Sequence, residues 1–232
     1  MDPQNIVLMI TVLLLSISVH ESAHAYVASR CGDQTAKRQG RISLNPMDHI
    51  DPFGTILVPA LLIMMGMPAF GWARPVPVNP GRLGKPRRDR ALVSAAGPGS
   101  NFALALLSLF LCAIFAPVLS DQVIPLGEGL GKLLLLSVLI NTLLGVFNLI
   151  PFPPLDGHGI LEYFLSRDAV RWFRQNRTMI QFVLIAFIFL GPLGMILNPF
   201  ISMMFRFQLF LVNLFWGMGT ANEIGILFQS AF

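Results

Sequence analysis

The sequence has few charged residues. They make up 12% of the 232 residues, whereas hydrophobic residues make up 54% and the mean hydropathy is +0.68. Soluble globular domains carry about 25% charged residues, so this composition excludes an ordinary soluble domain. The chain is instead expected to be an integral membrane protein.

Cysteines are also scarce, and basic residues are missing from the start of the chain. The two cysteines, Cys31 and Cys112, are too few for a disulfide framework and are expected to be free thiols without a metal role. No Lys or Arg precedes Arg30, so the basic leading region of a signal peptide is absent. The first apolar run is therefore expected to remain as a helix.

The basic residues are distributed unevenly. Ten of the sixteen fall between Arg30 and Arg90, four more fall between Arg167 and Arg177, and the 120–131 loop has none. Such asymmetry orients membrane proteins, because basic loops stay in the cytoplasm. The net charge of +4 therefore predicts an orientation, with both basic segments inside, and does not indicate a nucleic-acid partner.

Long apolar runs predict the membrane spans. Uncharged runs cover residues 91–120, 133–155 and 178–205, and each exceeds the roughly 20 helical residues that cross a hydrocarbon core. The opening run, 6–28, is a fourth candidate and 207–219 a fifth. The expected fold class is an all-α polytopic helical bundle with about four to six membrane segments.

One apolar segment, 53–72, does not fit a simple crossing. Two prolines and Gly66 interrupt it, and Arg41 and Arg74 flank it on opposite sides. A complete crossing would place one of these arginines on the wrong face of the membrane. A re-entrant or interfacial hairpin is therefore expected.

The first apolar run contains an H-E-x-x-H pattern formed by His20, Glu21 and His24. On a helix, positions 20 and 24 project from the same face one turn apart, so both imidazoles can bind one Zn²⁺. Glu21 is rotated by about 100° and suits a general base that is not a ligand.

The simpler interpretation of these residues is hydrogen bonding between helices. However, three ionisable residues at this spacing arise by chance in roughly one chain of this size in a hundred. Burying a carboxylate within a span also costs a few kcal/mol. We therefore interpret the pattern as a metal site.

A catalytic zinc usually has three protein ligands, so a third ligand must lie elsewhere. His49, His158 and the carboxylates are candidates. The most suggestive is Asp156, in the stretch FNLIPFPPLDGHG (147–159), where prolines and glycines prevent regular helix. Unwound backbone at membrane depth is tolerated only where it is buried in protein or lines a watery cavity.

Together the two motifs resemble the site-2 protease family of intramembrane zinc metalloproteases, peptidase family M50. The first motif is His20-Glu21-x-x-His24, and the second is Asn148-x-x-Pro151-x-Pro153-x-Leu155-Asp156-Gly157. The similarity covers about residues 6–165 and is closest to compact bacterial members without a PDZ or CBS domain. One departure is His158, which replaces the family's second glycine and is interpreted as a spectator at the rim of the site.

The resemblance implies that His20, His24 and Asp156 hold one Zn²⁺ and that Glu21 is the general base. It also implies that Asn148 helps to hold the substrate or the developing oxyanion. The partners would be the lipid bilayer and transmembrane protein substrates, cleaved in or near their transmembrane segments. The protein would be multi-pass in the cell (inner) membrane, with its active site near the cytoplasmic side.

Two regions are expected along the chain. Residues 1–165 would form the metalloprotease core, with spans at about 91–118 and 131–152, and residues 166–232 would form an amphipathic segment and a C-terminal helical hairpin. Within the core, two β-branched or proline-punctuated stretches of the 38–80 region, 38–46 and 74–80, are expected to form a small cytoplasmic-side β element. Such an element could hold an extended substrate. The alternative is a plain cytoplasmic hairpin.

The alternative function is a non-proteolytic membrane zinc-binding protein or transporter. A transporter is expected to carry several ionisable residues along a path through the membrane, and the spans carry little beyond the one cluster. An inactive relative would be expected to lose the base, but Glu21 is present. Both observations favour the hydrolase.

Overall fold

The structure is a computed structural model that describes residues 3–67, 71–119, 125–216 and 224. These residues are helical or irregular, and none of them forms a β-strand. Four helices in this part of the chain are long and apolar enough to cross a membrane: Gln4–Arg30, Pro86–Phe115, Gly129–Asn148 and Pro192–Phe215. The expected all-α multi-pass membrane protein is confirmed.

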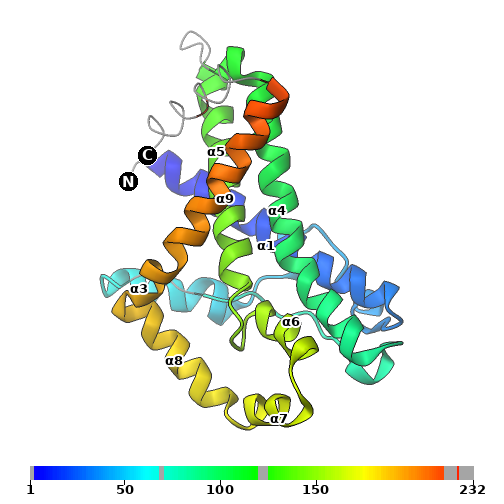
Figure 1. Cartoon of the computed structure of the whole chain (residues 1–232). Helices are drawn as coiled ribbons and strands as arrows, with labels where there is room; N and C mark the ends of the chain where they lie inside the picture. The colour runs from blue at the N-terminus through cyan, green and yellow to red at the C-terminus, as the bar shows by residue number, and fades with distance from the viewer. Residues whose placement is uncertain (1–2, 68–70, 120–124, 217–223, 225–232) are drawn as a thin grey trace.

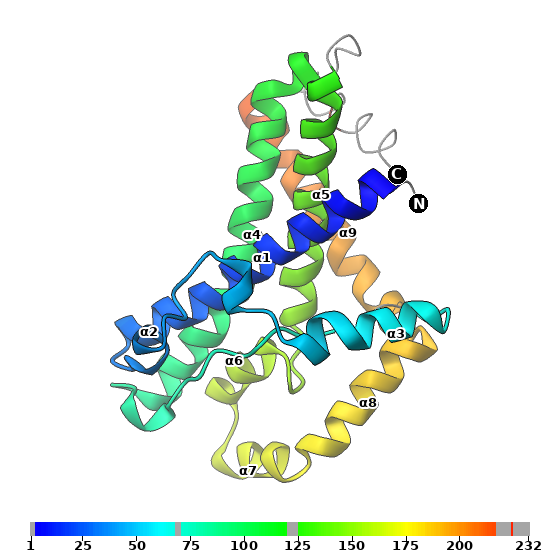
Figure 2. The same ribbon diagram turned by 180° about the vertical axis from the view of Figure 1, so that it is seen from behind.

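The long helices are stacked in three layers (Figures 1 and 2). Helices α4 (Pro86–Leu119) and α5 (Pro125–Asn148) stand side by side, and α1 (Pro3–Arg30) crosses one face of this pair. Helix α9 (Pro192–Trp216) runs along the opposite face. The α4–α5 pair is therefore the core on which the other spans pack.

Small side chains let α4 and α5 approach closely. A Cβ atom on Gly145 of α5 would lie 2.6 Å from the ring of Phe102 on α4, so a larger residue would have to displace this ring. Further along, Leu109 and Cys112 of α4 pack with Val138 of α5 in a buried apolar cluster. Cys112 is a fully buried free thiol, as expected.

The last apolar runs divide at a different place from the one that the sequence suggests. Helix α8 (Arg177–Leu190) and α9 meet at Gly191, which adopts φ 90° and is followed by Pro192. A left-handed glycine followed by proline ends a helix sharply, whereas Arg206 lies within α9 without interrupting it. With 14 residues, α8 is shorter than a full crossing, and residues 217–219 of the expected fifth run lie outside the described part.

The 53–72 segment folds back on itself. A π-helix, Pro52–Leu57, leads into α3 (Val58–Met64). The Trp72 N–H then donates to the Gly54 carbonyl at 3.1 Å, and the Thr55 hydroxyl donates to the Trp72 carbonyl at 2.9 Å. The described ends of the segment are thus hydrogen-bonded to each other, and its re-entrant or interfacial placement in the membrane stays a prediction.

The expected β element is wrong. Residues 38–46 and 74–80 contain no strand, and no backbone hydrogen bond joins these two described stretches. The Arg74 N–H instead donates to the carbonyl of His49, which lies beyond the first stretch. Prolines in the second stretch lack the N–H groups that a ladder needs. The buried Arg41 guanidinium holds the two loops together in place of strand pairing, because it donates hydrogen bonds to the carbonyls of Asp48, Arg74 and Pro75.

Short elements gather at one end of the molecule. Asp33, fully buried, accepts hydrogen bonds from Thr35 at the start of α2 (Thr35–Arg38) and from the Asn79 N–H before the 3₁₀ turn Pro80–Arg82. Burial alone would raise the pKa of Asp33, but these hydrogen bonds outweigh it and lower the pKa. Another 3₁₀ turn covers Pro46–Asp48, and α6 (Asp156–Phe164) and α7 (Arg167–Gln175) lie at the same lower end of Figure 1.

Arg41→Leu tests whether this arginine organises the loops. The substitution removes the donors from buried carbonyls, so we expect the free energy of unfolding to fall by about 2–4 kcal/mol. Arg38→Leu, at an exposed position on α2, is the control and should change it by less than about 0.5 kcal/mol. Denaturation in detergent micelles measures both, and equal stability of the two variants would contradict the role of Arg41.

Candidate active site

The first two site residues come from one face of α1. His20 and His24 are both 8% exposed, and their Nε2 atoms lie 3.1 Å apart. The helical spacing of four residues places the rings on neighbouring turns. Their centroids are 4.7 Å apart, and the ring planes are nearly perpendicular, at 85°. The expected pairing of the two imidazoles is therefore present.

Asp156 reaches the same point from the loop that follows α5. Helix α5 ends at Asn148 because Pro151, Pro153 and Pro154 follow, and α6 starts at Asp156. The intervening turn is tight: a Cβ atom on Gly157 would collide with the carbonyl oxygens of Leu149 and Ile150. The proline-rich loop thus turns the chain back and directs the Asp156 carboxylate at α1.

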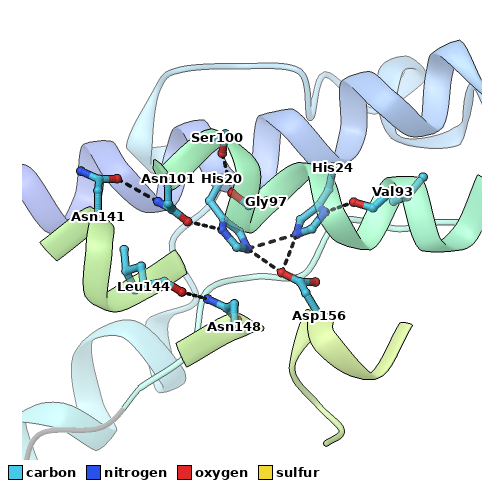
Figure 3. A network of polar contacts seen from close by, with 10 residues as sticks. All are labelled: His20, His24, Val93, Gly97, Ser100, Asn101, Asn141, Leu144, Asn148 and Asp156. Atoms are coloured by element: carbon cyan, nitrogen blue, oxygen red, sulfur yellow. Dashed lines mark hydrogen bonds and ion pairs between the residues drawn. The ribbon is translucent and has the colours of Figure 1, made fainter. Parts of the chain in front are cut away.

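The three side chains converge on one point (Figure 3). Asp156 Oδ2 lies 3.1 Å from His20 Nε2 and 3.3 Å from His24 Nε2. Within the described residues, this is the one group of three or more His, Cys, Asp or Glu side chains with the spacing of a metal site. The structure brings together the two expected histidines and the expected carboxylate.

These distances fit a bound zinc ion. Tetrahedral zinc with nitrogen and oxygen ligands at 2.0–2.2 Å separates its ligand atoms by about 3.4 Å, and the three observed separations are 3.1–3.3 Å. In addition, Asp156 Oδ2 is buried and has no hydrogen-bond donor. A buried carboxylate oxygen facing two ring nitrogens is stabilised by a shared cation.

Helix α4 orients both rings. His24 Nδ1 lies 2.7 Å from the Val93 carbonyl oxygen, which can only accept, so Nδ1 carries the proton and Nε2 of the neutral ring is free to bind a metal. His20 Nδ1 lies 2.6 Å from Asn101 Oδ1. Both contacts are visible in Figure 3. The ring nitrogens that face Asp156 are thus presented by partners on a second helix.

Gly97 allows α4 to lie this close. A Cβ atom at this position would be 2.5 Å from His20 Cε1 and 2.5 Å from His24 Nε2. No larger residue fits without moving both rings.

Glu21 lies beside the cluster but is not part of it. Its side chain is half-buried and makes no hydrogen bond or ion pair with another described residue.

The next residue, Ser22, anchors the loop that follows α1 by accepting a hydrogen bond from the Ser43 N–H at 3.1 Å. His49 belongs to the same loop, where Nε2 contacts the Ser43 carbonyl at 2.8 Å. Because His49 makes this contact and is not one of the three converging side chains, it is not a candidate ligand.

Two other residues named from the sequence lie near the cluster. The Asn148 amide donates to the Leu144 carbonyl of its own helix at 3.0 Å, so it is turned partly away from the metal ligands. His158 lies on α6 with Nε2 3.2 Å from Glu162 Oε1. Burial lowers the pKa of His158 below its ordinary value, and Glu162 offsets this only in part.

A polar cavity of about 170 Å³ adjoins Asp156. Glu162, buried in its wall, pairs with Arg90 of α4 at 2.9 Å and with Arg174 of α7 at 3.4 Å. These ion pairs connect α6, the helix that Asp156 begins, to both neighbours. The cavity offers water a polar environment next to the carboxylate.

Comparisons with known proteins identify the family of this chain. The model of "Peptidase family M50" matches residues 8–125 and 117–191. The chain belongs to this family. It is 41% identical over 186 residues to the Bacillus subtilis protein named "Putative zinc metalloprotease YwhC". These residues are 80% of this chain and 81% of that protein. The resemblance to the site-2 protease family is thereby confirmed.

A further relative of this M50 family member is the Mycolicibacterium smegmatis protein named "Putative zinc metalloprotease Rip2". It is 34% identical over 166 residues, which are 71% of this chain and 60% of that relative. The Mycobacterium tuberculosis protein of the same name shows the same identity and coverage. No solved structure matches the chain.

In this family member, the residues behind the histidines belong to the stretch AAGPGSNF (95–102). Small residues in a span favour close helix packing, and an asparagine there favours a hydrogen bond to another helix. The structure adds that Gly97 faces both imidazoles and that the partner of Asn101 is His20. The partner's identity depends on which helices lie next to each other.

Gly97→Ala tests the close approach of α4. The added methyl group would displace both imidazoles, so we expect zinc affinity to fall at least about ten-fold. Gly99→Ala is the matched control, because a Cβ atom there meets nothing within 4 Å. Competition with a chelator measures both affinities, and unchanged zinc binding by Gly97→Ala would show that the rings do not bind metal in this arrangement.

Proposed function

We propose that this protein is a membrane-embedded zinc metalloprotease that hydrolyses peptide bonds in or near the transmembrane segments of membrane proteins. The observation that carries the proposal is the convergence of His20, His24 and Asp156 on one point beside a glutamate within a candidate span. Membership of peptidase family M50 supports the same chemistry.

In this proposal His20, His24 and Asp156 hold one Zn²⁺. When bound, the ion acts as a Lewis acid that polarises a carbonyl and makes water nucleophilic near pH 7. One ion is proposed because the described residues contain one such group of ligands. The burial of the histidines excludes competing solvent from the nitrogen atoms that face Asp156.

Glu21 is the general base. It neighbours His20 on the same helix, and no described residue occupies its carboxylate with a hydrogen bond or ion pair. It therefore remains able to accept a proton from the attacking water and to transfer it to the leaving amine. Burial and the charge of Arg74 lower the pKa of Arg41, and the nearby charge of Glu21 offsets this only in part.

Asn148 is proposed to bind the substrate or the developing oxyanion. One amide N–H is engaged by the Leu144 carbonyl, and an asparagine amide has a second N–H. That donor lies at the end of α5, just before the loop that carries Asp156. An N–H directed at an oxyanion would stabilise the transition state.

Two cavities support access for water and for an apolar substrate. The polar cavity reaches Asp156. An apolar cavity of about 650 Å³ lies between α5, α8 and α9, with Leu149 and Phe152 of the loop before Asp156 in its wall. We propose that it receives part of a transmembrane substrate, since its lining is apolar throughout.

The charge distribution supports the location. The basic segments 30–90 and 167–177 flank the ends of α1 and α5 that carry the site. By the rule that basic loops remain in the cytoplasm, the site lies near the cytoplasmic side of the cell (inner) membrane. The division into a core of residues 1–165 and a C-terminal region, 166–232, is part of this proposal.

Glu21→Gln tests the catalytic role. We expect the variant to retain zinc but to cleave a single-span membrane protein about 10²–10⁴-fold more slowly, because a glutamine cannot accept the proton. Gel-based cleavage and metal analysis of the same preparation measure the two properties. Wild-type cleavage by a zinc-loaded variant would exclude Glu21 as the base.

Two histidine variants provide the controls. His24→Ala should lose both zinc and activity, whereas His158→Ala should keep zinc because that ring pairs with Glu162. A protein that binds zinc through these ligands but cleaves no member of a substrate panel would favour the alternative, a non-proteolytic zinc-binding protein or transporter.

A further inference from the structure

We infer that Asn141 is a positioning residue for the proposed metal site: it sets the orientation of the Asn101 amide and thereby the tautomer of His20. The inference rests on the proposed function, in which His20 Nε2 binds zinc. It concerns a residue on α5 that touches none of the three proposed ligands.

The orientation of the Asn141 side chain is determined by its partners. Its amide nitrogen donates to the Ser137 carbonyl at 2.9 Å and to the Ser16 hydroxyl of α1 at 2.9 Å. A backbone carbonyl can only accept a hydrogen bond, so the NH₂ group must face Ser137. The Asn141 carbonyl oxygen therefore faces α4.

The same reasoning determines the orientation of the Asn101 amide and then which ring nitrogen of His20 carries the proton. Asn101 Nδ2 donates to Asn141 Oδ1 at 2.9 Å, which turns Asn101 Oδ1 toward His20 Nδ1 at 2.6 Å. An amide oxygen can only accept, so His20 Nδ1 carries the proton. Its Nε2 is then the unprotonated nitrogen that faces Asp156 (Figure 3).

Burial makes this hydrogen-bond relay, which runs from Asn141 through Asn101 to His20, necessary. Asn101 and Asn141 are both 0% exposed and Ser16 is 2% exposed, so water cannot replace a missing partner. If the Asn101 amide were turned around, its NH₂ group would face Nδ1 and the proton of the neutral ring would move to Nε2, where it blocks a metal. His24 does not need such a relay, because the backbone carbonyl of Val93 cannot rotate in this way.

A purely structural role for Asn141 is the competing explanation, because the same hydrogen bonds connect α1, α4 and α5. The next residue, Thr142, separates the two explanations. It is also 0% exposed and bonds across helices, accepting from Gln208 of α9 at 3.0 Å, but it is not part of the relay to His20. Thr142→Val is thus a matched control for the loss of a buried interhelical hydrogen bond.

The first measurement is the zinc affinity of the full-length protein in detergent, with Co²⁺ absorption as a report on coordination. Loss of a group that orients a metal ligand typically costs 10–100-fold in affinity. We expect that loss for Asn141→Leu and less than a two-fold change for Thr142→Val, although both variants should unfold at lower temperature. If Asn141→Leu does not fold, Asn141→Ser, whose shorter side chain cannot reach Asn101, should show the same loss of affinity.

The second measurement removes the need for the relay. In Asn101→Asp, either carboxylate oxygen accepts from His20 Nδ1, so orientation by residue 141 no longer matters. In that background we expect Asn141→Leu to change zinc affinity less than two-fold. An equal loss in both backgrounds would assign Asn141 a structural role and overturn the inference.

The remaining outcomes separate this inference from the proposed function. Wild-type zinc affinity in Asn141→Leu would overturn the inference and leave the metalloprotease intact. A wild-type protein that binds no zinc would instead remove the proposed function, and the inference with it.

Discussion

The structure depends on the cost of holding three lone pairs together inside an apolar environment. His20, His24 and Asp156 place two ring nitrogens and one carboxylate oxygen within 3.1–3.3 Å of each other. Such atoms repel one another and have lost the stabilisation that water would give. A cation compensates for both losses, and much of the surrounding structure keeps these atoms where a cation can bind them.

Each helix contributes to that arrangement in a different way. Helix α1 supplies the two histidines, α4 approaches closely at Gly97 and supplies Val93 and Asn101, and α5 leads into the turn that delivers Asp156. The α4–α5 pair is therefore both the packing core and the support of the site. The buried side chains of Asn101, Asn141 and Thr142 are partnered across helices, as a low-dielectric interior requires.

Much of the fold and site could be predicted from the sequence because the signals are local. A helical spacing of four residues pairs His20 with His24, and prolines after Asn148 require the helix to stop. The β element at 38–46 and 74–80 could not be excluded in this way. Both stretches have suitable residues, but the buried Arg41 binds the carbonyls of Arg74 and Pro75, which lie more than 30 positions away in the sequence. The glycine–proline pair at Gly191 is a local signal for the end of a helix, but the charge of Arg206 led us to expect the division between spans there instead.

The sequence by itself determined the membrane class, the two motifs and the residues that carry them, because hydropathy, helical period and helix-breaking residues act over a few positions. Only the tertiary structure decided that Asp156, and not His49 or His158, meets the histidine pair, and that Asn101 and Asn141 stand behind His20. Those outcomes depend on which faces of α1, α4 and α5 touch. Helix contacts are set by the shapes of facing side chains, glycines included, and no stretch of one helix encodes them alone.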